Sequence, residues 1–387
     1  MVLLLSACVA AALAATPIAP RNAPIVVVRV PHGGIQPQAV VDRAGTIHLL
    51  YYSGDHTAGD LFYVKSKDSG ATWSEPLRVN SEPGTAIAAG TIRGGQIAIG
   101  KNGRIHVAWN GSSKAQAAGP LNPESGKRGE PMLYSRLNNA GTAFEPERNL
   151  MTRTFGLDGG GAVAADAAGD VYVAWHGKAR GAAEGEAGRQ VWLAVSHDDG
   201  KTFAPEVAAW QQPTGACGCC GMAIFADSKG VVRALYRSAT ESVHRDIYLL
   251  ASSDHGRSFT GRKLHEWQIN ACPMSSMGFA EGAGRVEGAW ETAGQVYFEN
   301  LSSQSSSPVA ATGDRKGRKH PRLAIGSNGE SLLIWTEGTG WNRGGSLAWQ
   351  LYKPDGTPDG EMHSAPGVPA WSFGAVVPKS DGFVILY

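Results

Sequence analysis

Three segments of the chain share one eight-residue pattern: Ser66-Lys67-Asp68-Ser69-Gly70-Ala71-Thr72-Trp73, Ser196-His197-Asp198-Asp199-Gly200-Lys201-Thr202-Phe203 and Ser252-Ser253-Asp254-His255-Gly256-Arg257-Ser258-Phe259. The pattern is Ser-x-Asp-x-Gly-x-Thr-aromatic, with Ser258 in the place of Thr in the third copy. A looser copy with an insertion covers residues 135–144. Copies at well-separated places in a chain indicate a fold built from repeated units.

Each fixed position in this pattern has a physical use. The short Asp can accept hydrogen bonds from the backbone N–H groups of its own turn. Gly supplies the positive φ that a tight hairpin needs. Thr and the aromatic residue favour a new strand, and the ring can bury itself between sheets. We therefore predict a structural role, in three β-hairpin turns, for Asp68, Gly70, Trp73, Asp198, Gly200, Phe203, Asp254, Gly256 and Phe259.

A second repeat alternates with the first. It consists of a small or apolar strand, a turn with glycine, and an alternating apolar strand that ends in an aromatic residue. The copies cover residues 38–51, 96–109, 162–175, 222–236, 277–290, 322–335 and 375–387. Alternating strands with glycine turns at a long, regular period are typical of a β-propeller. Seven copies predict seven antiparallel four-stranded blades, in which each inner hairpin is followed by an outer one.

The two ends of the chain are expected to close the ring together. No outer hairpin follows the seventh copy, and the apolar run at residues 25–30 could complete that blade and cover a free sheet edge. Trp109, Trp175, Trp290 and Trp335 end second strands. We expect them in the core between blades rather than on a ligand surface, because large apolar side chains at strand ends are usually buried.

The eight-residue pattern resembles the Asp box, or BNR repeat, of the sialidase-like β-propellers. Cys217-x-Cys219-Cys220, followed by Cys272-Pro273, resembles an exported bacterial group of such proteins. The resemblance implies an all-β propeller with its Asp boxes on outer hairpins, away from the ligand face. The enzymes of the family usually have six blades, so six is the alternative to seven. Such a resemblance implies an architecture more than an activity.

Composition limits the function classes. The chain has 387 residues, with 51 Gly and 21 Pro, which suits an all-β fold rich in turns. Lys and Arg total 35 against 34 Asp and Glu, so the sequence predicts neither a nucleic-acid stripe nor a polybasic membrane patch. No apolar run of the mature chain is long enough for a transmembrane helix. We expect one propeller domain over residues 24–387.

The N-terminus is typical of an export signal. Residues 2–15 are almost wholly apolar and small, and Ala12-Leu13-Ala14 fits a small-x-small cleavage site, which predicts a signal peptide over residues 1–15. No basic segment precedes the apolar run. Leu5-Ser6-Ala7-Cys8 also fits a lipobox, although the apolar run continues past Cys8. The predicted location is therefore periplasmic or secreted, with a lipid-anchored form or a cytosolic protein as alternatives.

Polar residues and cysteines stand where the innermost strands are expected to begin, which is where propellers place ligands. Glycines flank several of them and allow close approach of a backbone or ligand. A functional pocket and a packed, salt-bridged channel are both consistent with this convergence. The residues are His32, Gln36, Arg93, Asp158, Cys217, Cys219, Cys220, Cys272, His320 and Arg322.

Sialidases hold the substrate carboxylate with three arginines, use a Tyr nucleophile polarised by a Glu, and use an Asp as acid and base. The resemblance implies Arg93, Arg237 and Arg322 as carboxylate ligands, since Arg binds carboxylates in a bidentate way, and Asp158 as the acid. The match is partial, because the Arg-Ile-Pro motif of the family is absent and no Tyr–Glu pair can be assigned. His32, near the place of that motif, and His320 are further catalytic candidates at the channel mouth.

The cysteines depart from the usual sialidase pattern. Four remain after the predicted signal, and an even number in an exported protein suggests two disulfides with three possible pairings. A direct bond between Cys219 and Cys220 is one of the possibilities. The alternative is a soft-metal site for Cu(I) or Zn on Cys217, Cys219, Cys220 and Cys272, near Met222, Met274 and Met277.

Three functions follow as hypotheses. The first is an exported exo-sialidase-type glycoside hydrolase that acts on an anionic sugar without a cofactor. The second is a non-catalytic propeller that binds a glycan or a protein. The third is a metal or redox protein built on the cysteines. The expected partner is a glycan or glycoconjugate, and no nucleic acid is expected.

Overall fold

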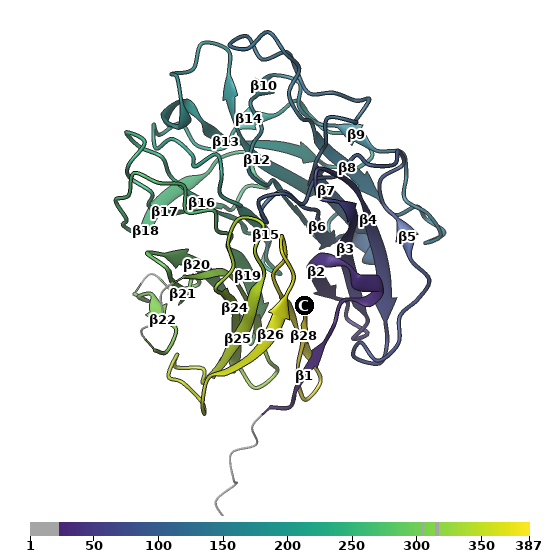
Figure 1. Ribbon diagram of the computed structural model, residues 1–387, viewed down its shortest axis with the longest axis vertical. Helices are drawn as coiled ribbons and strands as arrows, with labels where there is room; N and C mark the ends of the chain where they lie inside the picture. Colours follow the sequence, from purple (N-terminus) through teal and green to yellow (C-terminus); the bar gives the residue numbers. More distant parts are fainter. Residues whose placement is uncertain (1–22, 304, 314–316) are drawn as a thin grey trace, which may run out of the picture.

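The computed structural model describes residues 23–303, 305–313 and 317–387, and these form a ring of seven sheets around a central axis (Figure 1). The sheets follow one another in chain order, from purple through green to yellow. The prediction of an all-β propeller with seven blades is confirmed, and the six-bladed alternative is wrong. The predicted signal peptide and the lipobox at Cys8 lie outside the described residues.

The first three blades contain most of the N-terminal half. Blade 1 has β2 (Ile35–Val41), β3 (Ile47–Asp55), β4 (Ala58–Ser66) and β5 (Leu77–Arg78). Blade 2 has β6 (Gln96–Ile99), β7 (Ile105–Asn110), β8 (Met132–Arg136) and β9 (Arg148–Asn149). Blade 3 has β11 (Ala162–Ala165), β12 (Val171–Ala179), β13 (Gln190–Ser196) and β14 (Val207–Ala208), with β10 (Thr154–Phe155) paired to the end of β12.

The next three blades repeat the arrangement. Blade 4 has β15 (Ala223–Ala226), β16 (Val232–Arg237), β17 (Ile247–Ser252) and β18 (Thr260–His265). Blade 5 has β19 (Gly278–Gly282), β20 (Arg285–Thr292), β21 (Gln295–Asn300) and β22 (Val309–Ala310). Blade 6 has β23 (Arg318–Ile325), β24 (Ser331–Glu337), β25 (Gly345–Tyr352) and β26 (His363–Val368). Short 3-10 helices lie at η1 (Pro31–Gly33), η2 (Lys101–Gly103) and η3 (Glu186–Gly188).

The seventh blade joins the two ends of the described chain. It has three described strands, β27 (Ala375–Lys379), β28 (Gly382–Leu386) and β1 (Ile25–Val28). β1 pairs with β28 in parallel, with Ile25 opposite Phe383 and Val28 opposite Leu386. The predicted closure of the ring by its terminal strands is confirmed, and it removes the free edge that β28 would otherwise present.

The core consists of seven apolar clusters, one at each boundary between neighbouring blades. Trp109, Trp175, Trp290 and Trp335 are almost completely buried in four of them. The prediction that these rings lie between blades is therefore confirmed. Burial of such large side chains supplies much of the free energy that holds adjacent blades together.

The three segments with the eight-residue pattern form turns with the same hydrogen bonds, here called the outer turns (66–73, 196–203 and 252–259). In each, the Asp carboxylate accepts from the backbone N–H four residues on, at 2.9 Å for Asp68, 2.8 Å for Asp198 and 2.9 Å for Asp254. The outer turns join the third and fourth strands of blades 1, 3 and 4. Since strands alternate in direction, they lie at the end of the ring opposite the loops between second and third strands.

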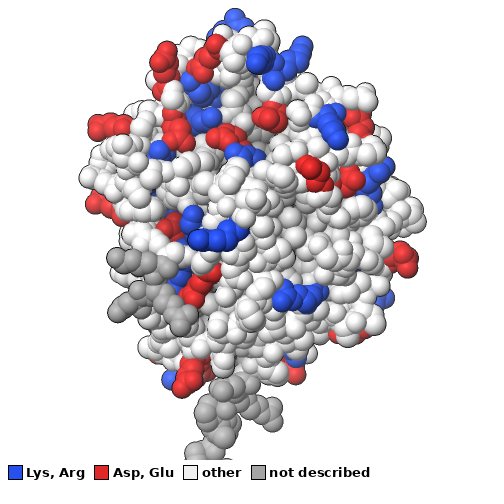
Figure 2. Space-filling view, viewed as in Figure 1, with Lys and Arg blue, Asp and Glu red and all other residues white. Residues whose placement is uncertain are grey.

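The surface carries charges of both signs. Figure 2 shows lysines and arginines interspersed with acidic residues, above all in the upper half of that face, and a lower half that is mostly uncharged. Among the described residues, no helix is long and apolar enough to cross a membrane.

Candidate functional site

The seven segments that lead into the innermost strands, here called the approach segments, meet on the axis. Between them they leave a cavity of only about 10 Å³, here called the constriction, which is lined by residues from all seven blades. Beyond the constriction, the innermost strands enclose an axial channel of about 310 Å³ with mostly small and apolar walls. The residues at the constriction are Gln36, Thr91, Ile92, Gly94, Gln96, Gly161, Gly221, Met222, Ser276, Arg322 and Phe373.

The approach segments are strained. Three of them hold a residue other than glycine in the left-handed region, and β2 and β23 hold one more each where their pairing is irregular near the start of the strand. These five residues have φ between 50° and 64°: Gln36, Thr91, Met274, His320 and Trp371. Each such residue costs on the order of 1–3 kcal/mol and persists only where its surroundings fix it. Strain of this kind concentrates at binding and catalytic sites, so this end of the ring is the candidate location of a functional site.

A cleft of about 340 Å³ lies at this end of the ring, and we call it the mouth cleft. Arg93 and Asp158, from the approach segments of blades 2 and 3, form an ion pair on its wall. The Arg93 Nε also donates to the backbone O of Asp158, at 2.8 Å. Asn110 donates to the same backbone, at 3.1 Å to the O of Asp158 and 2.8 Å to that of Gly159. The Asp158 segment is thus held by both side chains.

An exposed tryptophan lies on the cleft. Trp341, in the loop between β24 and β25, keeps 61% of its surface exposed. Its ring meets Trp371 edge-on at 4.8 Å between centroids, and Trp371 stacks on His56 at 5.2 Å. Glu130, at the end of the loop before β8, brings a second carboxylate to the cleft. The cleft thus combines an aromatic surface with one cation and two carboxylates.

Arg322 lies deeper, at the axis, where it lines both the constriction and the channel, and His320 lies near it. The Arg322 Nη1 donates to Ser276 Oγ at 3.0 Å and to the backbone O of Met277 at 3.0 Å, and its guanidinium lies over the ring of Phe373. Burial lowers the pKa of Arg322 to about 10 and holds the pKa of His320 well below its usual range. Ser276 Oγ also lies 3.2 Å from His320 Nδ1. Within the described residues Arg322 forms no ion pair.

Arg237 lies in a separate buried network. It pairs with Glu291 of the next blade, with 3.2 Å between Nη2 and Oε2, and both side chains are almost fully buried. Burial raises the pKa of Glu291, although Arg237 opposes that shift. The three arginines expected to converge on one carboxylate therefore have separate partners. Only Arg93 lines the mouth cleft.

His32 takes no part in this arrangement. It lies exposed in η1, and its ring stacks on Tyr51 at 6.3 Å between centroids. Of the sequence candidates, the structure brings together Arg93 with Asp158 and His320 with Arg322. It leaves Arg237 and His32 apart from both pairs.

The cysteines form one disulfide and one thiol pair. Cys219 and Cys272 are bonded, whereas Cys217 and Cys220 are free and buried. The expectation of two disulfides is therefore wrong for this state, and a direct Cys219–Cys220 bond is excluded. The disulfide occupies two of the four sulfurs proposed for the soft-metal alternative, which leaves Cys217 and Cys220 as the thiols that could bind a metal in this state. The sulfurs of Cys217, Cys219 and Cys220 nevertheless lie within 4.8 Å of one another.

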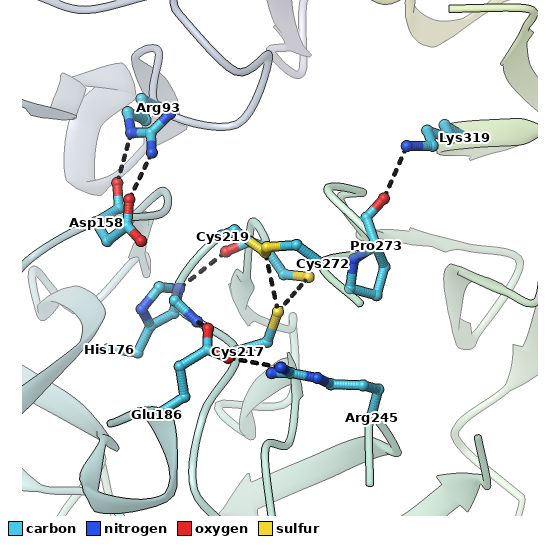
Figure 3. Close-up of a disulfide and its surroundings, with 12 residues drawn as sticks. Arg93, Asp158, His176, Glu186, Cys217, Cys219, Arg245, Cys272, Pro273 and Lys319 are labelled. Carbon is cyan, nitrogen blue, oxygen red and sulfur yellow. Dashed lines mark hydrogen bonds and ion pairs between the residues drawn. A yellow bond between two sulfur atoms is a disulfide. The ribbon is translucent and has the colours of Figure 1, made fainter. Parts of the chain in front are cut away.

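Figure 3 shows how the two sites adjoin. The Arg93–Asp158 pair lies on one side of His176 and the cysteines lie on the other. The His176 Nε2 is 2.9 Å from the backbone O of Cys220. A Cβ on Gly159 would lie 2.4 Å from the backbone oxygens of Cys220 and Gly218, so the two segments touch through their backbones.

Sequence reasoning missed Trp341, Glu130, Ser276 and Glu291. Trp341 stands in Gly338-Thr339-Gly340-Trp341, and a large aromatic residue inside a glycine-rich loop is a signal that could have found it. Glu130 ends a loop that reads as an ordinary charged surface segment. Nothing local marks Ser276 or Glu291, because their importance comes from residues on neighbouring blades.

Comparisons with known proteins show a fold shared at low sequence identity. A protein of unknown function from Dyadobacter fermentans has 16% identity and a TM-score of 0.53, over 90% of this chain and 98% of that one. An α-L-arabinanase from Penicillium chrysogenum, complexed with arabinobiose, has 14% identity and a TM-score of 0.51, over 87% of this chain and 94% of that one. A Hadza microbial sialidase has 13% identity and a TM-score of 0.50, over 85% of this chain and 70% of that one.

These likenesses confirm the fold predicted from the sequence, a sialidase-like β-propeller. No protein-family model matches the sequence, and the curated proteins include no significant match. A fold shared at such low identity does not determine the activity.

Proposed function

We propose that the chain is a glycan-directed propeller that binds and hydrolyses a neutral glycoside in the mouth cleft. The observation that carries this proposal is the pairing of an exposed tryptophan with two carboxylates in one cleft at the channel mouth. Its volume of about 340 Å³ lies within the range of small-molecule sites, which combine apolar or aromatic walls with a few polar groups. The fold shared with an arabinanase and a sialidase also supports a glycan ligand.

The charges on the cleft favour a neutral sugar over an anionic one. Arg93 is its only cation among the described residues, and Asp158 already pairs with it, while Glu130 adds a second negative charge. One positive and two negative groups repel a substrate carboxylate on balance. A sialidase-type clamp would need Arg93, Arg237 and Arg322 at one point, and their present partners oppose that arrangement.

The two carboxylates suggest a division of roles. Most glycoside hydrolases use one carboxylic acid to protonate the leaving oxygen and one carboxylate to attack the anomeric carbon or activate water. Asp158 is paired with the guanidinium of Arg93, so we assign it the second role rather than the acid role implied by the resemblance. Glu130 would supply the proton. Trp341 would stack on the apolar face of the sugar ring.

The test is hydrolysis of fluorogenic glycosides by the purified protein, with an α-L-arabinofuranoside, a β-D-glucoside and an α-sialoside in parallel. We expect release from a neutral glycoside, a fall of about 100-fold or more in kcat for Asp158→Asn, and a KM about 10-fold higher for Trp341→Ala. Trp349→Ala, on β25 outside the cleft, is the matched control. Cleavage of the sialoside that depends on Arg237 and Arg322 would instead establish the sialidase-type function.

We also propose that the protein is exported. The Cys219–Cys272 disulfide supports this, since such bonds persist in oxidising compartments. Fractionation of cells that express the full chain would test it, and recovery of the protein in the cytosol would contradict it.

A further inference from the structure

The four cysteines outside the mouth cleft lie in two approach segments that the disulfide ties together. Cys219 belongs to the segment before blade 4 and Cys272 to the segment before blade 5. Cys272 is exposed and Cys219 is half-buried, so solvent reaches this bond. Cys217 and Cys220 lie behind it, each only 1% exposed. The cluster thus has a surface disulfide and an inner thiol pair.

The sulfurs form a continuous path from the surface pair to the inner pair. The Cys217 Sγ lies 3.5 Å from the Cys219 Sγ and 2.7 Å from the Cys220 Sγ, without a bond to either (Figure 3). Thiol–disulfide exchange proceeds by attack of one sulfur on another, so sulfurs already in contact need little rearrangement. Cys217 stands between the disulfide and the second free thiol.

Hydrogen bonds fix both segments while leaving the sulfurs free to change partners. The Cys217 N–H donates to the backbone O of Arg237 at 2.9 Å, and the Gly221 N–H donates to that of Ser275 at 3.0 Å. Glu186 accepts from the Gly218 N–H. On the other segment, the Lys319 ammonium donates to the backbone O of Pro273 at 2.8 Å. The backbone would keep its place when one disulfide replaces another.

The charges around the inner pair favour one thiolate. Burial opposes ionisation of Cys220, but the hydrogen bond from the Cys217 thiol and the charge of Arg237 outweigh it and lower the pKa of Cys220. The hydrogen bond to Cys220 and burial raise the pKa of Cys217. One thiol therefore acts as the proton donor and its neighbour as the acceptor, and the thiolate is the reactive form.

We propose that the four cysteines form a dithiol–disulfide exchange site that passes two electrons from the inner pair, through the surface pair, to a disulfide on an external partner. This site does not depend on the proposed glycan function. Cys217 and Cys220 have the Cys-x-x-Cys spacing that redox pairs use, and they lie against a solvent-accessible disulfide rather than alone.

The electrons balance in each step. Cys217 gives its proton to Cys220 as its sulfur attacks Cys219, the Cys219–Cys272 bond breaks, and Cys272 leaves as a thiolate. The Cys220 sulfur then attacks Cys217, the Cys217–Cys219 bond breaks, and the Cys220 proton ends on the released Cys219 or Cys272 sulfur. One disulfide has been exchanged for another without an oxidant. The surface dithiol then reduces the partner disulfide to a dithiol and becomes the Cys219–Cys272 disulfide again.

Peptide mapping tests the internal exchange. Trypsin releases residues 202–229, with Cys217, Cys219 and Cys220, and residues 264–285, with Cys272. After an acid quench and alkylation, the state described here gives the two peptides linked. We expect a second population in which Cys272 is alkylated and residues 202–229 hold an internal disulfide. Cys220→Ser should remove the internal Cys217–Cys220 bond.

A second measurement follows electrons to a partner. Oxidised glutathione serves as the disulfide probe, and we expect the folded chain to reduce about one equivalent per chain. Cys217→Ser and Cys220→Ser should lose this transfer while keeping the Cys219–Cys272 bond, with near-UV circular dichroism to check the fold. Met222→Leu, a buried sulfur residue of the same segment without a thiol, is the matched control.

The inference is overturned if the wild-type protein shows only the Cys219–Cys272 linkage and reduces no glutathione while folded. Transfer that survives in both serine variants would overturn it as well. Glycoside hydrolysis is measured in a separate assay, so either proposal can fail without the other.

Discussion

The outer turns and the approach segments occupy opposite ends of the same blades, and they are built in opposite ways. The outer turns repeat one set of hydrogen bonds around Asp68, Asp198 and Asp254. The approach segments share a place in the fold and almost nothing else, since they carry an ion pair in one case, thiols in another and a buried arginine in a third.

The difference separates the residues that make the ring from those that can give it a function. The framework means the outer turns, which repeat in blades 1, 3 and 4, together with the apolar clusters, which recur at every boundary between blades. The approach segments do not repeat in this way, and backbone strain is stored at the channel mouth. Substitutions in the framework should therefore change stability, and substitutions at the mouth should change binding or chemistry.

The largest contrast is expected between two tryptophans. Trp175→Ala removes a fully buried ring between blades 2 and 3 and should lower the free energy of unfolding by about 3–5 kcal/mol. Trp341→Ala removes an exposed ring and should change it by less than about 0.5 kcal/mol. Urea unfolding followed by circular dichroism measures both. Equal losses in the two variants would contradict the separation of framework and mouth.

Two glycines provide the next contrast. Gly159→Ala places a Cβ 2.4 Å from two carbonyl oxygens, and neither can move without shifting the cysteine segment, so we expect a loss of about 3 kcal/mol. A Cβ at position 45 would meet open space, but the backbone there has φ +81°. Gly45→Ala should therefore lower the free energy of unfolding by about 1–2 kcal/mol. Denaturant midpoints of both variants test the order. A smaller loss of stability for Gly159→Ala than for Gly45→Ala would mean that the backbone at Gly159 is not tightly packed against the cysteine segment.

How far the sequence predicts the molecule depends on the range of the interaction. The blade count, the closing strand and the four buried tryptophans follow from local alternation and turn residues, so the sequence was sufficient for them. The partners of Arg93 and Arg237 are set by contacts across blades, and no local spacing encodes them. The cysteine pairing has the same origin, because Cys219 and Cys272 are 53 residues apart and meet only in the closed ring.

Substitution of the aspartate in an outer turn should have a smaller effect on stability, and this effect should depend on pH. Burial raises the pKa of Asp198, but hydrogen bonds from Thr202 and Ser196 outweigh it and lower that pKa from 3.8 to about 2. The lowered pKa stabilises the fold above about pH 4, and this contribution is lost as the pH falls towards 2. Asp198→Asn should cost about 1 kcal/mol at neutral pH.

The check is the difference in unfolding free energy between the wild type and Asp198→Asn at several pH values. The difference should shrink as the pH falls from 4 to 2. A difference that stays constant over that interval would show that the carboxylate charge does not stabilise the turn.

The smallest effect is expected at the loose fourth copy of the turn. The Asn138 side chain accepts from the Thr142 N–H at 3.0 Å, in the way that the aspartates do elsewhere. Asn138→Asp should therefore stabilise the fold by no more than about 0.5 kcal/mol. A thermal melt of the variant is sufficient to test it, and a clear loss of stability would set this turn apart from the other three.

The parallel pairing of β1 with β28 has a consequence for how the protein forms. During synthesis the N-terminal strand emerges first, and its partner emerges only after more than three hundred further residues. Until then the seventh blade is incomplete, and β1 is an unpaired edge available to other chains. Contacts of such long separation slow folding. The ring can therefore close only after β27 and β28 have been made. Until then, contacts among the first six blades alone stabilise the incomplete ring.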